Sequence, residues 1–153
     1  MRNGWVSRVG IIALVGGLCL GGYGLAHAEK PIKPRFSVLS KDPAWVLDKT
    51  TGLQWQKAPS SEPLPWTNAV AYCTNLGDDS RLPEVKELIS LVDYSQFTPA
   101  LPSGHPFTTV QSGIYWSATT YAFFPSLAWL MSFDNGQNNH YDKGNLYLPW
   151  CVR

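Results

Sequence analysis

Residues 66–88, WTNAVAYCTNLGDDSRLPEVKEL, decide the fold class because they contain two helical patterns separated by a turn. Within residues 66–76 the apolar side chains follow the spacing of one helix face, and Gly77 is suited to end that helix. Pro83 is favoured in the first turn of a helix. The apolar side chains that follow share one side of that second helix: Val85, Leu88, Ile89 and Val92.

Strand patterns flank these two helices. Residues 44–47 (AWVL) and 53–56 (LQWQ) are short β-rich runs, and Gly52 lies at the exit of the turn between them, so they predict a hairpin. After the helices, a long loop over residues 94–113 leads to further predicted strands at 114–119, 127–133 and 146–152, with a turn at 134–136. Two helices followed by antiparallel strands predict an α+β domain.

The N-terminus is typical of an export signal. Arg2 and Arg8 precede an apolar stretch over residues 9–25 without a charge, and Ala26-His27-Ala28 provides a cleavage site with small residues. A retained transmembrane anchor is the alternative, but the stretch is short for a span and contains six glycines. We therefore expect a signal peptide at 1–28 and an exported protein, periplasmic or extracellular, without a stable membrane span.

Residues 29–43 (EKPIKPRFSVLSKDP) are rich in proline and lysine and show no apolar period, which predicts a flexible tether. The folded domain is then expected over residues 44–153. The chain after residue 28 carries ten Lys/Arg and eleven Asp/Glu. This balance argues against a nucleic-acid-binding protein, which needs a basic face.

Two cysteines, Cys73 and Cys151, remain once the signal is removed together with Cys19. In an oxidising compartment two cysteines most simply form one disulfide. It would tie the first predicted helix to the last predicted strand and stabilise the fold by roughly 4 kcal/mol. Two free buried thiols are the alternative.

Six short motifs, in this order, resemble the DUF1566 family, also called the Lcl C-terminal domain family, over residues 44–153. They are TGLQWQ at 51–56, WxxAxAYC at 66–73, RLPxVxEL at 81–88, YWSATT at 115–120, FDNG at 133–136 and CVR at 151–153. The resemblance implies a fold similar to C-type-lectin-like domains and to formylglycine-generating enzymes. Such a fold packs two helices on a twisted, mainly antiparallel sheet with long loops.

The same resemblance implies a disulfide between the first helix and the final strand, where Cys73 and Cys151 lie. It also implies binding of a glycan, because the best-known relative is a surface adhesin whose domain binds sulfated glycans, although fold alone does not fix function. The chain departs from the family at Ser80, where a tryptophan is usual, and at Trp150, where an arginine is common.

The sequence offers little for catalysis, so we expect no enzyme. After the signal only His105 and His140 remain as histidines, and no Gly-x-Ser-x-Gly motif is present. The chain also has too few His and Cys residues for zinc. The acidic residues Glu84, Glu87 and Asp93 share one helix, which is typical of a solvated face.

Calcium is the one metal with suitable ligands in the sequence. Oxygen-bearing side chains crowd into nine residues, at Asp134, Asn135, Asn138, Asn139 and Asp142. However, Asp134-Asn135-Gly136 is also a common hairpin turn. We favour the turn and expect no metal or other cofactor.

Aromatic side chains are the best candidates in this sequence for contacts with a ligand. Those in predicted helices and strands are expected in the core: Trp55, Trp66, Trp116 and Trp129. Aromatics on connecting loops are more often exposed and functional. The predicted ligand-binding residues lie in residues 120–126 or in the polar stretch after Gly136: Tyr121, Phe123, Phe124, Asn138, His140 and Tyr141. Arg81 is expected to hold loop carbonyls or a carboxylate such as Asp93.

These observations predict an exported, non-catalytic binding module that recognises a glycan or another surface ligand through one loop-rich face. The alternative is a structural or assembly component of a bacterial envelope complex that binds a protein partner.

Overall fold

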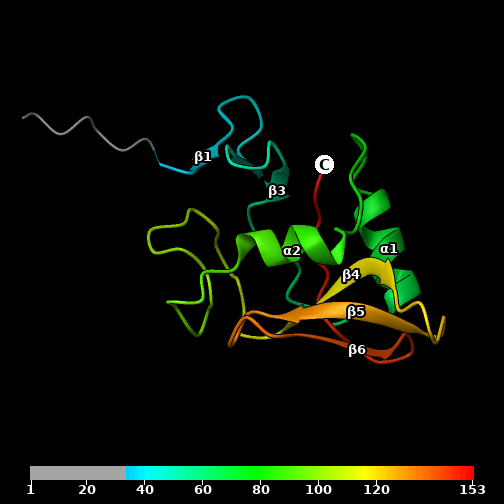
Figure 1. The fold of residues 1–153 in the computed structure, drawn as a ribbon. Helices are drawn as coiled ribbons and strands as arrows, with labels where there is room; N and C mark the ends of the chain where they lie inside the picture. Colours follow the sequence, from blue (N-terminus) through cyan, green and yellow to red (C-terminus); the bar gives the residue numbers. More distant parts are fainter. Residues whose placement is uncertain (1–33) are drawn as a thin grey trace, which may run out of the picture. The chain divides into compact units, whose positions relative to one another are not determined.

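The computed structural model describes residues 34–153, which contain two helices and two three-stranded antiparallel sheets (Figure 1). The first sheet consists of β1 (Phe36–Val38), β2 (Trp45–Asp48) and β3 (Gln54–Gln56). The helices are α1 (Trp66–Thr74) and α2 (Val85–Leu91). The second sheet consists of β4 (Ile114–Thr120), β5 (Leu127–Ser132) and β6 (Asn138–Asp142). The predicted α+β class is confirmed.

The predicted hairpin is present as β2 and β3, but the predicted tether is wrong over its second half. Residues 36–38 form β1, which pairs antiparallel with β2. Phe36 is buried and packs edge-to-face on Phe107, with 5.1 Å between ring centroids. One aromatic anchor in a proline- and lysine-rich segment is too little to produce a periodic pattern, so the strand escaped prediction. The predicted signal peptide and residues 29–33 lie outside the described residues.

In the second sheet the predicted strands β4 and β5 are present, whereas β6 was missed. Its sequence NNHYD is polar and mostly exposed, because β6 is an edge strand paired only with β5. The predicted strand at 146–152 forms only isolated bridges: Tyr147 with Leu64, Leu148 with Tyr115, and Val152 with both Trp55 and Arg81. Pro149 lies inside this segment and has no N–H to donate to a ladder.

The two helices pack on opposite faces of the second sheet because consecutive strand residues point in opposite directions. Tyr115 and Met131 share a buried cluster with Leu88 and Leu91 of α2. Their neighbours in sequence, Trp116 and Leu130, share another cluster with Ala69 and Cys73 of α1. Figure 1 shows α2 lying along the sheet, with the loop over residues 94–113 at one end of β5 and the β4–β5 connection at the other.

The N-terminus of α2 is fixed by the carboxylates of Glu84, which is exposed, and Glu87, which is partly buried. Arg81 donates two hydrogen bonds of 2.7 Å to the Glu87 carboxylate, which also accepts from the Glu84 backbone N–H. Burial is the largest single influence and raises the pKa of Glu87, but the hydrogen bonds from Arg81 and the Glu84 N–H together with the charge of Arg81 lower the pKa overall. Arg81 therefore holds a carboxylate and the Leu82 carbonyl, as predicted, but the carboxylate is that of Glu87 and the expected example Asp93 is wrong. Asp93 accepts hydrogen bonds from Ser95 instead.

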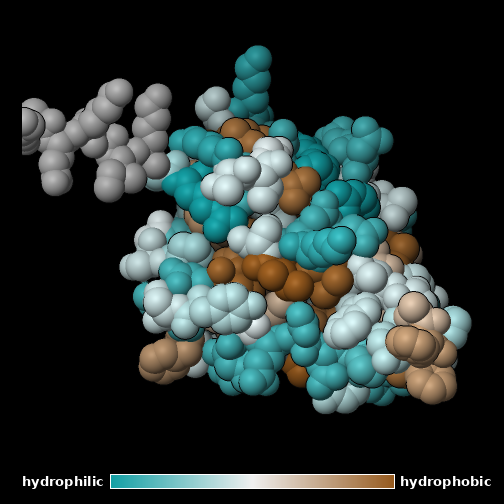
Figure 2. Space-filling view, viewed as in Figure 1, coloured by the Kyte–Doolittle hydropathy of each residue, from teal (hydrophilic) through white to brown (hydrophobic). Residues whose placement is uncertain are grey.

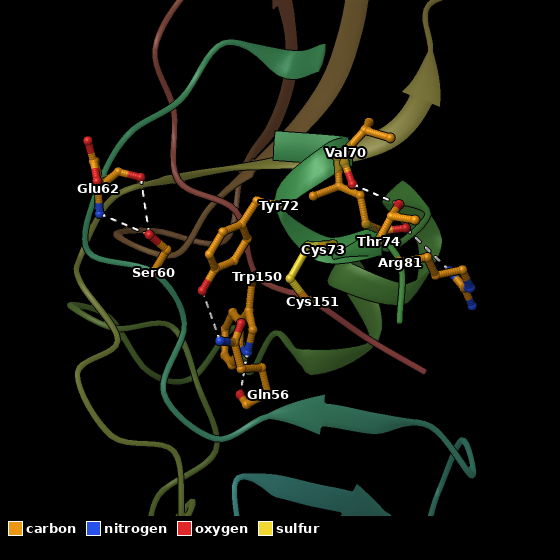
Figure 3. Close-up of a disulfide and its surroundings, with 11 residues drawn as sticks. Gln56, Ser60, Glu62, Val70, Tyr72, Cys73, Thr74, Arg81, Trp150 and Cys151 are labelled. Carbon is orange, nitrogen blue, oxygen red and sulfur yellow. Dashed lines mark hydrogen bonds between the residues drawn. A yellow bond between two sulfur atoms is a disulfide. The ribbon is translucent and has the colours of Figure 1, made fainter. Parts of the chain in front are cut away.

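The predicted disulfide is present and joins α1 to the C-terminal segment (Figure 3). Cys73 and Cys151 are completely buried. Beside the bridge, the Trp150 indole donates a hydrogen bond of 2.7 Å to the Gln56 carbonyl, and the Gln56 N–H donates to the Cys151 carbonyl. The bridge thus connects α1 covalently to a segment that is hydrogen-bonded to the first sheet.

Replacing both Cys73 and Cys151 with alanine should lower the free energy of unfolding by roughly 4 kcal/mol, because the bridge closes a long loop in the unfolded chain. Urea unfolding of the wild type and the double variant measures this loss. A reductant should destabilise the wild type by a similar amount and leave the variant unchanged. Equal stability of the two proteins would contradict the prediction.

A second polar network connects the first sheet to α2. The Asp48 carboxylate is fully buried and accepts two hydrogen bonds from Arg35, at 2.9 and 2.6 Å. It also accepts from the Thr50 N–H and the Thr51 hydroxyl, while Arg35 donates to the Ser90 carbonyl of α2. Burial is the largest single influence and raises the pKa of Asp48, but the hydrogen bonds from Arg35, Thr50 and Thr51 together with the charge of Arg35 lower the pKa overall.

Asp48→Asn should destabilise the protein at neutral pH by about 3 kcal/mol, because Arg35 and two donors lose a charged partner. A lowered pKa means that the stabilisation is present above the ordinary aspartate value of about 3.9 and is lost as pH falls toward the folded-state value. Urea unfolding should therefore show a difference between variant and wild type that shrinks below that pH. Asp93→Asn, whose carboxylate bonds only Ser95, is the matched control and should change stability little.

Candidate functional site

The six predicted ligand-binding residues separate into two surfaces on opposite faces of the second sheet. In the register of β5 and β6, Trp129 lies opposite His140, and Ala128 lies opposite Tyr141. Adjacent strand residues point to opposite faces, so His140 and Tyr141 cannot serve one surface. The structure therefore brings four of the predicted residues together and places Asn138 and Tyr141 at a separate surface.

Four of the predicted residues meet at the β4–β5 connection. The Tyr121 ring stacks on the His140 ring with 3.9 Å between centroids and 8° between planes. The rings of Phe123 and Phe124 lie 5.7 and 6.2 Å from the Tyr121 ring, measured between centroids. Phe123 is 80% exposed and Phe124 is 62% exposed. We call this set, together with Trp129, the aromatic tip.

Trp129 was expected in the core but is only half-buried and belongs to the aromatic tip. Its ring lies edge-on to Tyr121 at 5.5 Å and to His140 at 5.2 Å. Trp66 is also half-buried, and Lys143 lies over its ring at 4.1 Å. Trp55 and Trp116 are fully buried as predicted. A strand position alone does not reveal how far along each face of the sheet the covering helix reaches.

A groove opens on the other face of the sheet, where β4 begins and β5 ends. Its main hollow has a volume of about 510 Å³. A second hollow of about 200 Å³ shares Ile114 and Ser132 with the first, so the two are continuous. Besides these two, the main hollow is lined by Pro63, Gln111, Ser112, Gly113, Asp134, Leu146, Tyr147 and Leu148, and the second by Leu130, Asn135, Gln137, Asn138, Asn139 and Tyr141.

Of the predicted site residues, Asn138 and Tyr141 line this groove. The Tyr141 ring lies 5.7 Å from the ring of Tyr147, which packs edge-on against Trp116. The residues from 111–113 and 146–148 were not predicted, because the fold brings them together from distant parts of the chain. The proline- and glycine-bearing loop at 94–113 was the only sequence signal near them.

The groove combines hydrogen-bonding side chains with apolar surface and carries almost no charge. Amides and hydroxyls alternate with leucine, isoleucine and tyrosine side chains. Asp134 is the single ionisable side chain other than tyrosine, and no lysine or arginine lines either hollow. Such a surface suits an uncharged ligand that both donates and accepts hydrogen bonds.

Three of the five candidate calcium ligands, Asn135, Asn139 and Asp142, accept a local backbone hydrogen bond. Asn135 Oδ1 accepts from the Gln137 N–H at 3.1 Å, and Asp142 Oδ1 accepts from the Gly144 N–H at 2.8 Å. Asp134 Oδ1 accepts from the Thr98 hydroxyl. Within residues 34–153 no three His, Cys, Asp or Glu side chains gather as a metal site would require. These contacts favour the turn over a calcium site.

Millimolar calcium or a chelator should therefore leave the melting temperature unchanged, since the oxygen atoms already serve the local backbone. Differential scanning calorimetry with and without the ion measures this. A calcium-dependent rise of several degrees, abolished by Asp134→Asn but not by Asp93→Asn, would contradict the prediction.

With the fold and both surfaces described, the chain can be compared with known proteins. No curated protein matches it. The family model for the Lcl C-terminal domain matches residues 44–153, which include α1, α2 and all strands except β1. The chain belongs to the Lcl C-terminal domain family.

Proposed function

We propose that this protein is an exported, non-catalytic binding module whose groove binds an uncharged segment of a glycan. The observation that carries the proposal is the lining of the groove, in which amide and hydroxyl groups lie beside apolar and tyrosine side chains without a cation. The volume of about 510 Å³ is typical of small-molecule sites.

The chemistry of a sugar fits this lining on both counts. Each sugar hydroxyl donates and accepts hydrogen bonds, and the amides of Gln111 and Asn139 offer both functions. The C–H faces of a sugar ring pack on aromatic or aliphatic surface, here provided by Tyr147 and by Leu146, which is 61% exposed.

The distribution of cations favours a neutral glycan over a sulfated one. All three arginines of residues 34–153 are paired with carboxylates: Arg35 with Asp48, Arg81 with Glu87, and Arg153 with Asp42 and Asp78. Recognition of sulfate would use unpaired arginine or lysine side chains in the groove.

The absence of catalysis remains part of the proposal and has two supports. Both cysteines of the described chain are bonded to each other, so neither is a nucleophile. The His140 ring stacks on Tyr121, and its buried Nδ1 has no hydrogen-bond partner within residues 34–153, so no carboxylate or carbonyl there orients it as a general base. The disulfide is compatible with export, since such bonds persist in oxidising compartments.

Screening against an array of neutral and sulfated glycans tests the proposal, and binding should be to neutral glycans. Tyr141→Ala should then weaken the best ligand at least about tenfold, because it removes aromatic surface from the groove. Tyr94→Ala is the matched control, since Tyr94 is 72% exposed and lines neither hollow.

Preferential binding of sulfated glycans, or equal losses in both variants, would contradict the assignment of the groove. Melting curves of both variants should be recorded first, so that a loss of binding is separated from a loss of fold. Recovery of a stoichiometric protein partner that competes for the groove would support an assembly role instead.

A further inference from the structure

We propose that the aromatic tip inserts into the lipid–water interface of a bilayer, independently of the groove. Phe123 is 80% exposed and Phe124 is 62% exposed, and the flanking Ala122 and Pro125 are exposed as well. Figure 2 shows a hydrophobic projection at the right-hand end of the molecule, where Figure 1 places the β4–β5 connection. Adjacent exposed phenylalanines at one tip mark an interaction surface.

The backbone of the connection holds these two side chains outward. The Tyr121 N–H donates to the Leu127 carbonyl, and the Leu127 N–H donates to the Phe124 carbonyl, both at 2.9 Å. Tyr121 is further held by its stacking on His140. The two phenylalanines thus project from a hydrogen-bonded connection on a rigid sheet, which allows insertion without reorganisation.

The charges around the tip suit a lipid interface of neutral headgroups. Residues 94–133 contain no Asp, Glu, Lys or Arg, so entry of Phe123 and Phe124 buries no charge of their own segment. The exposed Asp142 lies opposite Leu127, at the base of the connection. The nearest cation is Lys143, which donates to the Thr120 hydroxyl at 2.9 Å and whose N–H bonds the Ser126 carbonyl at the base of the connection.

The order of side chains along the tip matches the polarity gradient of a bilayer surface. Phe123 and Phe124, which carry no polar atom, are outermost. Tyr121, Trp129 and His140 lie behind them with polar ring atoms suited to headgroup depth. Lys143 lies at the base of the connection, where its ammonium donates to the Thr120 hydroxyl and lies over the Trp66 ring.

A lipid surface fits this projecting shape better than a protein does. A protein partner would need a pocket complementary to both rings, whereas the headgroup–acyl boundary deforms around them. The tip residues also line neither hollow of the groove. Trp129 and His140 lie on the sheet face opposite Tyr141, so one molecule can use the tip and the groove at the same time.

An environment-sensitive fluorophore at Phe123→Cys tests the insertion directly. The full-length chain, in a Cys19→Ser background that leaves only the new thiol free, is mixed with phosphatidylcholine vesicles that contain no glycan. We expect a blue shift of emission at position 123. The matched site is Phe97→Cys, because Phe97 is also 80% exposed and should show no shift.

Phe97 is a stringent control because it lies at the other end of β5. The N–H of the next residue, Thr98, donates to the carbonyl of Asp134, which follows β5, whereas Phe123 precedes that strand. Six strand residues separate the two ends by about 20 Å, more than the depth of an interface. Equal shifts at both positions, or none at position 123, would overturn the proposal.

Vesicle co-sedimentation supplies the second measurement. Replacing Phe123 and Phe124 together with alanine should reduce partitioning about tenfold relative to Phe97→Ala, and the loss should not depend on salt. Both proteins have the same N-terminus, so its contribution cancels. Equal partitioning of the two variants would overturn the proposal, whatever the result of glycan screening.

Discussion

The path of the last seven residues is the constraint on which the rest of the structure depends. They bridge to the first sheet at Trp55, to Arg81 before α2 and to β4 at Tyr115, and they are bonded covalently to α1 through Cys151. Because these contacts reach across most of the sequence, the segment converts two small sheets and two short helices into one cooperative unit. It also forms one wall of the groove through Tyr147 and Leu148.

Charge pairing gives the molecule its internal connections and, as a result, determines the character of its surfaces. Arg35, just before β1, bonds to α2, and Arg81, just before α2, bonds to the first turn of that helix. Arg153 bonds the C-terminus to two loops. Each pairing satisfies a cation that would otherwise be available to an anionic ligand. Within residues 34–153, neither the groove nor the aromatic tip contains a lysine or an arginine.

The sequence predicted the elements that have one buried face. Both helices, β2 to β5 and the disulfide follow from apolar spacing, turn residues and cysteine count, because burial on one side leaves a periodic pattern. β6 was missed because an edge strand solvated on both sides has no such pattern. Of the residues that line the groove only Asn138 and Tyr141 were predicted, and the loop aromatics lie at the aromatic tip instead. Gln111, Ser112 and Leu146 meet only in three dimensions. β1 precedes the family match and depends on one anchoring ring, Phe36.

The alternation along β6 has an evolutionary consequence. This single strand of five residues carries His140 toward one surface and Tyr141 toward the other. An insertion or deletion of one residue in β6 would exchange the faces of all its side chains and so disable both surfaces in one step. Substitutions, in contrast, can alter either surface while the other is preserved. Related domains should therefore vary freely in the residue types of this strand but keep its length.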